Sequence, residues 1–333
     1  MILQHRRSSM RIQIPACILL MVILLVLPVS AHVPGVTKGD VVIVPDAEKS
    51  YAWYGSLADA DEVDHYRIVA EVGTEIRLSL SSPESGVTPS VALIGPGITG
   101  QVPLPDFIEV PEGQGSVLIP AGNDPEISYE PFTPMAMYEI SSYSAAVPAA
   151  GEYTVAVFGD GGRYILATGY LEEFSLTEWL GIPVSVLGVR IWQGQSLFLN
   201  LVPILGAVLV GAWWFRKRIS SPSWPGVWLL AIAGFACIGS GILVILQMVI
   251  AGMLTGPVAS MTLTAFFAAI PVLLGVFLVR IAGKTGPSPS YRDRGVMAVL
   301  GILGLVFWAG LIAGPVLAIA ASLLPGYEPS KAP

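Results

Sequence analysis

Cysteine is nearly absent from this chain of 333 residues, and the two that occur, Cys17 and Cys237, lie far apart in apolar segments. They provide no disulfide framework for an exported domain, which must be held together by its own core. Charged residues are also scarce, at 12%, against about 25% in a typical soluble domain. Together with a mean hydropathy of +0.70, this scarcity excludes an ordinary soluble protein.

Charge is missing above all from four long apolar runs, at residues 196–215, 228–253, 257–279 and 296–324. Each approaches or exceeds the ~20 residues that a helix needs to cross ~30 Å of hydrocarbon. The sequence therefore predicts a bundle of four transmembrane helices over residues 196–324. Because the runs hold no Asp, Glu, Lys, Arg or His, they lack the usual components of an ion or proton pathway, which argues against a coupled pump.

Basic residues close the first run and separate the third run from the fourth. Seven of them lie in these two loops: Arg216, Lys217, Arg218, Arg280, Lys284, Arg292 and Arg294. Short basic loops stay on the cytoplasmic side of a membrane. We therefore expect a multi-pass protein of the plasma membrane, with residues 32–195 and the tail, residues 325–333, on the extracytoplasmic side.

Residues 32–179 are strongly acidic, with 22 Asp and Glu against five Lys and Arg. Such a balance argues against nucleic acid as a partner. We expect the lipid bilayer to be one partner. Because four helices exceed what an anchor needs, we also expect a membrane-protein partner or a second copy of the chain.

The first 31 residues have the three parts of a secretory signal peptide. A basic start contains Arg6, Arg7 and Arg11, an apolar run covers residues 14–28, and small residues precede a cleavage point after Ala31. This order is typical of signal peptides. Cleavage is expected, an uncleaved anchor is the alternative, and in either case the residues that follow are exported.

From His32 to Tyr170 apolar and polar residues alternate with a period of two, punctuated by Gly and Pro. Such alternation is typical of short strands joined by turns. Eight strands are predicted, at residues 41–44, 51–54, 65–69, 75–80, 90–94, 116–119, 153–158 and 164–168. The pattern predicts a jelly-roll-like β-sandwich over residues 32–172.

An interfacial helix or elbow is expected over residues 173–195, between this domain and the bundle. Ser175 and Glu178 have the spacing of a capping box, which predicts a helix start. Pro183 is expected to break or kink this helix. Arg190 and Trp192 are expected at the level of the lipid headgroups.

One block of the exported segment resembles a known module. It comprises Gly55-Ser56-Leu57, residues 62–68 (EVDHYRI), Val72-Gly73-Thr74 and residues 76–80, with residues 151–157 (GEYTVAV) and 163–166 (RYIL) as a closing pair. In these residues the chain resembles bacterial pre-peptidase C-terminal domains. It departs from their pattern at Glu62, His65 and Ile68, and it carries a long insert over residues 103–149. The resemblance implies a binding or stabilising module that is not itself catalytic.

Two metal sites are hypotheses at this point. After cleavage at Ala31, the free amine and imidazole of His32 would suit copper, with His65 as the only other exported histidine to complete the site. An acidic turn gathers Asp59, Asp61 and Asp64, whose carboxylates would suit calcium. The turn lacks the glycine and the closing glutamate of an EF-hand loop. The alternatives are two ordinary histidines and a solvated turn.

The apolar runs contain residues that favour close helix packing. Two pairs of small residues recur at four-residue spacing: Ala207 with Gly211, and Gly310 with Gly314. Such pairs let helix backbones approach, either within the bundle or between copies of the chain. Asn200 and Gln247 are expected to form hydrogen bonds between helices.

No nucleophile stands near a base in a recognisable catalytic spacing, so an enzyme is not expected. The sequence predicts a non-enzymatic envelope protein that displays its β-sandwich outside the cell, for binding or as an accessory subunit of a membrane complex. Two alternatives stay open. One is a copper-binding envelope protein that uses His32, and the other is a transporter of an uncharged or lipidic substrate.

Overall fold

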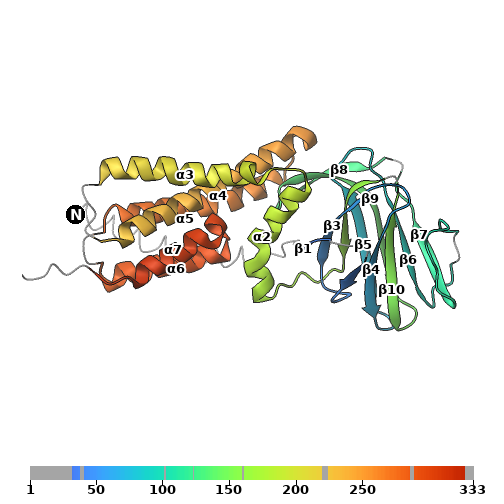
Figure 1. The fold of residues 1–333 in the computed structure, drawn as a ribbon. Coiled ribbons are helices and arrows are strands. Elements are labelled where there is room, and N and C mark those ends of the chain that lie inside the picture. Colours follow the sequence, from blue (N-terminus) through green and yellow to red (C-terminus); the bar gives the residue numbers. More distant parts are fainter. Residues whose placement is uncertain are drawn as a thin grey trace, which may run out of the picture.

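The computed structural model describes residues 32–37, 41–100, 103–122, 124–159, 161–219, 224–285 and 289–326. They form a β-rich domain and a long helical region that extends away from it (Figure 1). The predicted signal peptide and the last seven residues lie outside the described residues.

The described strands form two mixed sheets. They are β1 (Val33–Val36), β2 (Val41–Val44), β3 (Tyr51–Leu57), β4 (Val63–Ala70), β5 (Glu75–Ser82), β6 (Ser90–Pro96), β7 (Gln114–Ile119), β8 (Glu126–Glu130), β9 (Met135–Ala146), β10 (Gly151–Phe158) and β11 (Gly162–Thr168). One sheet has the order β1-β3-β11-β5-β9-β8 and the other β2-β4-β10-β6-β7. Only β1 with β3 and β2 with β4 pair in parallel among these strands.

A single core lies between the sheets, and it follows from the predicted alternation. Tyr66 and Ile68 on β4 are buried while Arg67 between them is exposed, and β5 repeats the pattern. The buried members from both sheets form one continuous cluster, as two half-buried faces require. The prediction of a β-rich domain is confirmed.

All eight predicted strands are present, and three others were missed. The short β1 contains Pro34 and Gly35, which disfavour a strand assignment. The other two, β8 and β9, form a hairpin within the insert, residues 103–149. This hairpin reaches the helices, where Thr264 donates a 2.8 Å hydrogen bond to the carbonyl of Pro131.

The helical region contains α2 (Leu176–Trp192), α3 (Leu197–Arg218), α4 (Gly226–Thr255), α5 (Met261–Ala282), α6 (Tyr291–Val306), the 3₁₀ turn η1 (Ala309–Ile312) and α7 (Ala313–Leu323). Within the described residues, α3, α4 and α5 are long and apolar enough to cross a membrane. These three helices suggest a multi-pass membrane protein. The prediction of four spans is wrong, because the fourth apolar run is folded differently.

The fourth run forms a helical hairpin. After α6 the chain takes positive φ at Trp308, Gly310, Leu311 and Ile312, which an α-helix does not allow. Two glycines of α6 then let α7 pack closely against it, since a Cβ on Gly301 would lie 2.6 Å from Ile319. With 16 residues, α6 is about 24 Å long, which is shorter than the hydrocarbon layer.

The hairpin brings its two ends to the same end of the bundle. Arg294, at the start of α6, donates to the carbonyl of Ser322 at the end of α7. Trp224, which precedes α4, donates to the carbonyl of Pro325. Residues 325 and 326 therefore lie at the end of the bundle with the basic loops, and not at the end with the β-domain. The side of the membrane on which the tail lies stays a prediction.

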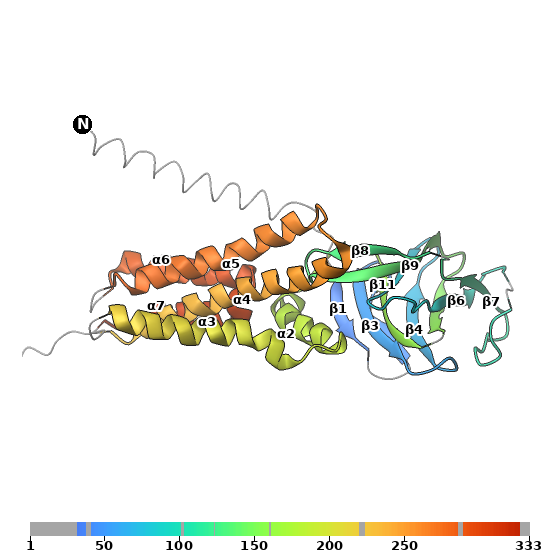
Figure 2. The ribbon, with the colours of Figure 1, turned by 90° about the horizontal axis from the view of Figure 1, so that it is seen from above.

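Helix α2 lies between the bundle and the β-domain in both views (Figures 1 and 2). Its predicted capping box is present, formed by Ser175 and Glu178. The helix continues through Pro183, which removes an N–H that would bind the carbonyl of Trp179. The indole of Trp308 binds that carbonyl instead, at 2.8 Å. Of the expected break or kink, the break is absent, because the helix is continuous across Pro183.

Candidate functional site

A cavity of about 1210 Å³ lies where the β-domain meets the helices. Its walls come from β3, β5, β9 and β11 of the six-stranded sheet, from α2, from α4 and α5, and from the tip of the α6–α7 hairpin. Cavities that bind small molecules usually measure about 300–1,000 Å³. We call this space the junction cavity.

The helical side of the junction cavity is mainly apolar and aromatic. Its lining includes Trp179, Leu243, Val244, Phe266, Phe267, Ile270, Trp308 and Leu311, and Phe132 from the turn between β8 and β9 lies against them. Two of the aromatic rings are in close contact, since the centroids of Trp179 and Trp308 are 4.4 Å apart, with their planes tilted by 39°. Such a wall favours hydrocarbon over water.

The sheet side of the junction cavity is more polar. Hydroxyl groups come from the outward faces of β5 and β9, at Ser79, Ser81, Ser142 and Ser144. The cavity thus has one apolar and one polar side, which is the arrangement that an amphipathic molecule requires.

Arg190 is the buried cation of the junction cavity, with 3% of its surface exposed. Its Nη1 donates to the carbonyl of Pro134 at 2.9 Å and to the side-chain oxygen of Gln193 at 3.0 Å. Both acceptors are neutral. Burial lowers the pKa of Arg190 to about 10, so the guanidinium stays charged at neutral pH. Arg190 is buried against the β8–β9 hairpin and does not extend freely from α2; its expected depth at the level of the lipid headgroups stays a prediction.

Glu130 at the end of β8 lines the same cavity. Its carboxylate accepts a 2.9 Å hydrogen bond from the backbone N–H of Phe132. Burial nevertheless raises the pKa of Glu130. Burial also raises the pKa of the neighbouring Tyr54, so its hydroxyl stays neutral.

Beside the junction cavity, three side-chain amides connect α3, α4 and the loop that precedes α3. Gln247 donates to Gln195 at 2.8 Å and to Asn200 at 3.1 Å. The predicted hydrogen bond between Asn200 and Gln247 is confirmed. Both residues are almost fully buried, and both line the cavity.

The two histidines of the copper hypothesis lie on different sheets. His32 precedes β1, lines the junction cavity and forms a hydrogen bond with the hydroxyl of Ser50. His65 is on β4, between the inward-facing Asp64 and Tyr66, so it points to the outer face of the other sheet. The structure does not bring the two imidazoles together.

The carboxylates of the calcium hypothesis are also separated. Asp64 is buried and accepts a hydrogen bond from the hydroxyl of Tyr164, which is itself 2.7 Å from the hydroxyl of Tyr66. Asp59 and Asp61 are exposed in the turn, where Asp59 accepts from the backbone of Asp61. Within the described residues, no group of three or more His, Cys, Asp and Glu could hold a metal.

The four predicted packing positions all face α4. A Cβ on Gly211 would lie 2.3 Å from the ring of Phe235, and a Cβ on Gly314 would lie 2.8 Å from the sulfur of Cys237. Ala207 lies against Gly239, and Gly310 lies against the backbone of residues 236–237. In the structure these positions therefore serve packing within one chain.

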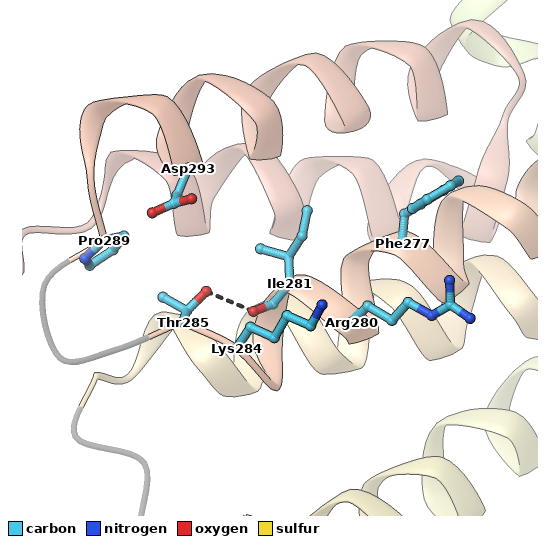
Figure 3. Close-up of a pocket in the computed structure, with 7 residues that line it drawn as sticks. All are labelled: Phe277, Arg280, Ile281, Lys284, Thr285, Pro289 and Asp293. Atoms are coloured by element: carbon cyan, nitrogen blue, oxygen red, sulfur yellow. Dashed lines mark hydrogen bonds between the residues drawn. The ribbon is translucent and has the colours of Figure 1, made fainter. Parts of the chain in front are cut away.

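A smaller pocket of about 360 Å³ lies at the other end of the bundle, between the end of α5 and the start of α6. Its charged groups do not converge. Asp293 caps α6 by binding Ser290, and Figure 3 shows Arg280 extending away from Asp293. Thr285, which follows α5, donates to the carbonyl of Ile281 in the last turn of that helix.

Sequence reasoning missed the role of Glu130 and the burial of Arg190. The available signal was weak: Arg190 is an isolated charge between two apolar segments, and Glu130 precedes Pro131 and Phe132 in an insert with no clear pattern. Their proximity depends on how the insert hairpin packs on α2, which no local pattern encodes.

No protein-family model matches the chain, and no curated protein matches it. The resemblance to pre-peptidase C-terminal domains therefore stays a prediction. Fold and site define a class only: a multi-pass membrane protein with a β-rich domain and a cavity at the junction of the two.

Proposed function

We propose that this protein is a non-enzymatic membrane protein that binds a lipid-like molecule between its β-domain and its helices. The observation that carries this proposal is the junction cavity, with apolar helical walls and a hydroxyl-bearing sheet face. Chains of a lipid would lie against the aromatic wall, and a headgroup would lie against the sheet.

The depth of the cavity supports a ligand from the bilayer. The 22 residues of α3 rise about 33 Å, which is close to the hydrocarbon thickness. Asn200, near the start of α3, lines the cavity. With α3 as a membrane span, the cavity would lie near one boundary of the hydrocarbon layer, where headgroup and chains of a lipid meet.

A lateral route from the bilayer is part of the proposal. Phe266 and Leu273 on α5 line the cavity and are 38% and 56% exposed. They place apolar surface at the outer side of α5, where lipid chains would pass. A transporter of a lipidic substrate would also bind a lipid-like molecule. The cavity by itself supports binding and gives no reason to propose transport.

The orientation is also proposed. Lys217 lies 3.8 Å from the ring of Trp213, and Arg218 lies 4.5 Å from the ring of Trp214. Paired cations and indoles suit the headgroup layer, and basic residues suit its cytoplasmic side. We therefore assign the opposite end, with a β-domain of the expected sandwich type, to the outside, where it would serve as a binding or accessory module.

Filling the junction cavity tests the proposal. Val244→Trp places an indole in the cavity, whereas Val249→Trp places it on the outer face of the same helix, where Val249 is 53% exposed and does not line the cavity. The full chain is extracted in mild detergent, and retained lipid is counted per chain by mass spectrometry. We expect V244W to retain several-fold less lipid than the wild type and V249W to match the wild type.

Equal lipid retention by the two variants would refute a binding role for the cavity. The same spectra report any second copy or companion protein by its mass. A chain that always appears alone would contradict the accessory-subunit part of the proposal, while leaving lipid binding intact.

A further inference from the structure

In the described structure, only one of the three nitrogens of the Arg190 guanidinium forms hydrogen bonds with the protein itself. Its two hydrogen bonds both start from Nη1. Within the described residues, Nε and Nη2 have no hydrogen-bond partner, and the cavity-lining Glu130 and Glu172 do not lie within 4.0 Å as ion-pair partners. Burying a cation without a counter-charge is costly.

The free side of Arg190 borders the junction cavity. In the described part of the chain, every fully enclosed side-chain nitrogen or oxygen has a hydrogen-bond partner, so the unpartnered Nε and Nη2 must adjoin open space. Arg190 is nearly inaccessible from outside and lines the cavity. The open space beside these two nitrogens is therefore the cavity.

The geometry of a guanidinium determines what this free edge can bind. Nε and Nη2 present two parallel N–H groups, which match the two oxygens of a carboxylate or phosphate. The carbonyl of Pro134 and the side chain of Gln193 hold the opposite side of the group. The free edge is thus fixed in place before a ligand arrives, which reduces the entropy lost on binding.

We infer that the junction cavity takes an amphipathic anion, whose phosphate or carboxylate binds the free edge of Arg190 while its apolar chains lie among the helices. This inference rests on the proposed function and adds the headgroup chemistry. The serine hydroxyls of β5 and β9 would receive the remaining polar part of the headgroup.

Two matched pairs of ligands test the inference with the full chain, stripped of lipid in detergent. Dioleoylphosphatidic acid is compared with dioleoylglycerol, and oleate with oleyl alcohol, so that within each pair only the anionic group is replaced by a hydroxyl. Bound ligand is counted by native mass spectrometry across a titration. We expect at least one anion to bind about tenfold or more tightly than its uncharged match, since a charged hydrogen bond contributes that much. The pair that shows this preference identifies phosphate or carboxylate.

Variants then assign the preference to Arg190. Arg190→Gln should reduce the ratio of affinities to within about twofold, and Arg292→Gln, an exposed cation at the other end of the bundle, should leave it unchanged. Arg190→Lys keeps a charge without the paired edge and should give an intermediate ratio. This variant decides the question if R190Q does not fold, because a wild-type ratio in R190K would overturn the role of the paired edge.

The outcomes separate the inference from the proposed function. Equal binding of charged and uncharged ligands by the wild type, or a preference that survives in R190Q, would overturn the inference while the cavity remains a lipid site. Absence of saturable binding by all four ligands would overturn both.

Discussion

Glu130 is a carboxylate in a place that disfavours its charge. Burial raises its pKa, and the backbone N–H groups of Phe132 and Thr133 offset only part of that cost. A group whose pKa is raised in the folded state stabilises the fold below its unfolded pKa, about 4.3 for glutamate. That contribution is lost as the pH rises through the folded pKa.

Glu130→Gln should therefore stabilise the protein at neutral pH, because the amide oxygen can keep the hydrogen bond while the buried charge is removed. The gain should shrink as the pH falls toward 4, where the wild-type carboxyl is protonated. Thermal midpoints of the full chain in detergent, measured from pH 4 to pH 8, check this. Glu126→Gln removes an exposed carboxylate of the same strand and is the control. A variant E130Q that melts below the wild type at pH 8 would contradict the assignment.

The environments of single charged residues such as Glu130 and Arg190 could not be predicted from the sequence, whereas local hydrogen bonds could. The capping box of Ser175 and Glu178 was predictable, because its donors and acceptors lie within one turn of chain. The hydrogen bond between Asn200 and Gln247 was predictable as a polar pair in apolar helices. The burial of Arg190 was not, because Pro134, its acceptor, is 56 residues away in sequence and lies in a hairpin without a strong pattern.

Helix α2 and the α6–α7 hairpin are connected by a hydrogen bond that takes the place of one missing inside α2. Pro183 removes the partner of the Trp179 carbonyl, and the indole of Trp308 supplies a new one. The hairpin tip is held from its other side by Ser240 of α4, whose hydroxyl accepts from the backbone of Gly310 at 2.8 Å. The tip thus connects the elbow helix to the bundle.

A double-mutant cycle tests this replacement. Trp308→Phe should destabilise the protein by about 1–3 kcal/mol, because it leaves a partly buried carbonyl without a partner. In a Pro183→Ala background the helix can supply its own N–H, so W308F should cost less there, by roughly 0.5–1 kcal/mol or more. Loss of ring contact is the same in both backgrounds and cancels. Equal costs of W308F in the two backgrounds, measured by unfolding in detergent, would rule out this role of the indole.

The fourth apolar run explains why element prediction failed at one place. Length and composition alone favour a single span over residues 296–324, and no charged residue interrupts them. The deciding features are Gly301, Gly304 and Pro315, which let two short helices pack closely. Their effect depends on contact between segments, so a window of hydropathy cannot detect it. The strands of the β-domain, in contrast, follow from a local period of two.

At the scale of the whole molecule, the β-domain and the bundle meet over a specific junction. The β8–β9 hairpin contacts α5 through the hydroxyls of Tyr129 and Thr264, 2.8 Å apart, and Phe132 packs against Phe267. On the other side, Lys49 of the β-domain binds Glu178 of α2 at 2.6 Å. These contacts enclose the junction cavity from two sides, so ligand binding there would join the two parts of the molecule.

The hairpin also sets the topology of the whole chain, and cysteine labelling tests it. With Cys17 and Cys237 replaced by Ser, single cysteines are introduced at Gly326 after α7, at Arg292 in α6 and at the exposed Val110 of the β-domain. A membrane-impermeant maleimide is applied to intact and to lysed cells. Three spans and a hairpin predict that G326C and R292C behave alike and opposite to V110C, because both hairpin ends lie at the same end of the bundle.

Four spans predict the reverse for G326C, which would then be labelled together with V110C in intact cells. The position of residue 326 alone therefore distinguishes the two topologies, and R292C controls for access of the reagent. Labelling of G326C and V110C without lysis, with R292C protected, would show that the fourth run crosses the bilayer in cells. Because α6 is about 24 Å long, such a crossing would require α6 and α7 to straighten into one helix and would remove the Trp308 tip from the junction cavity.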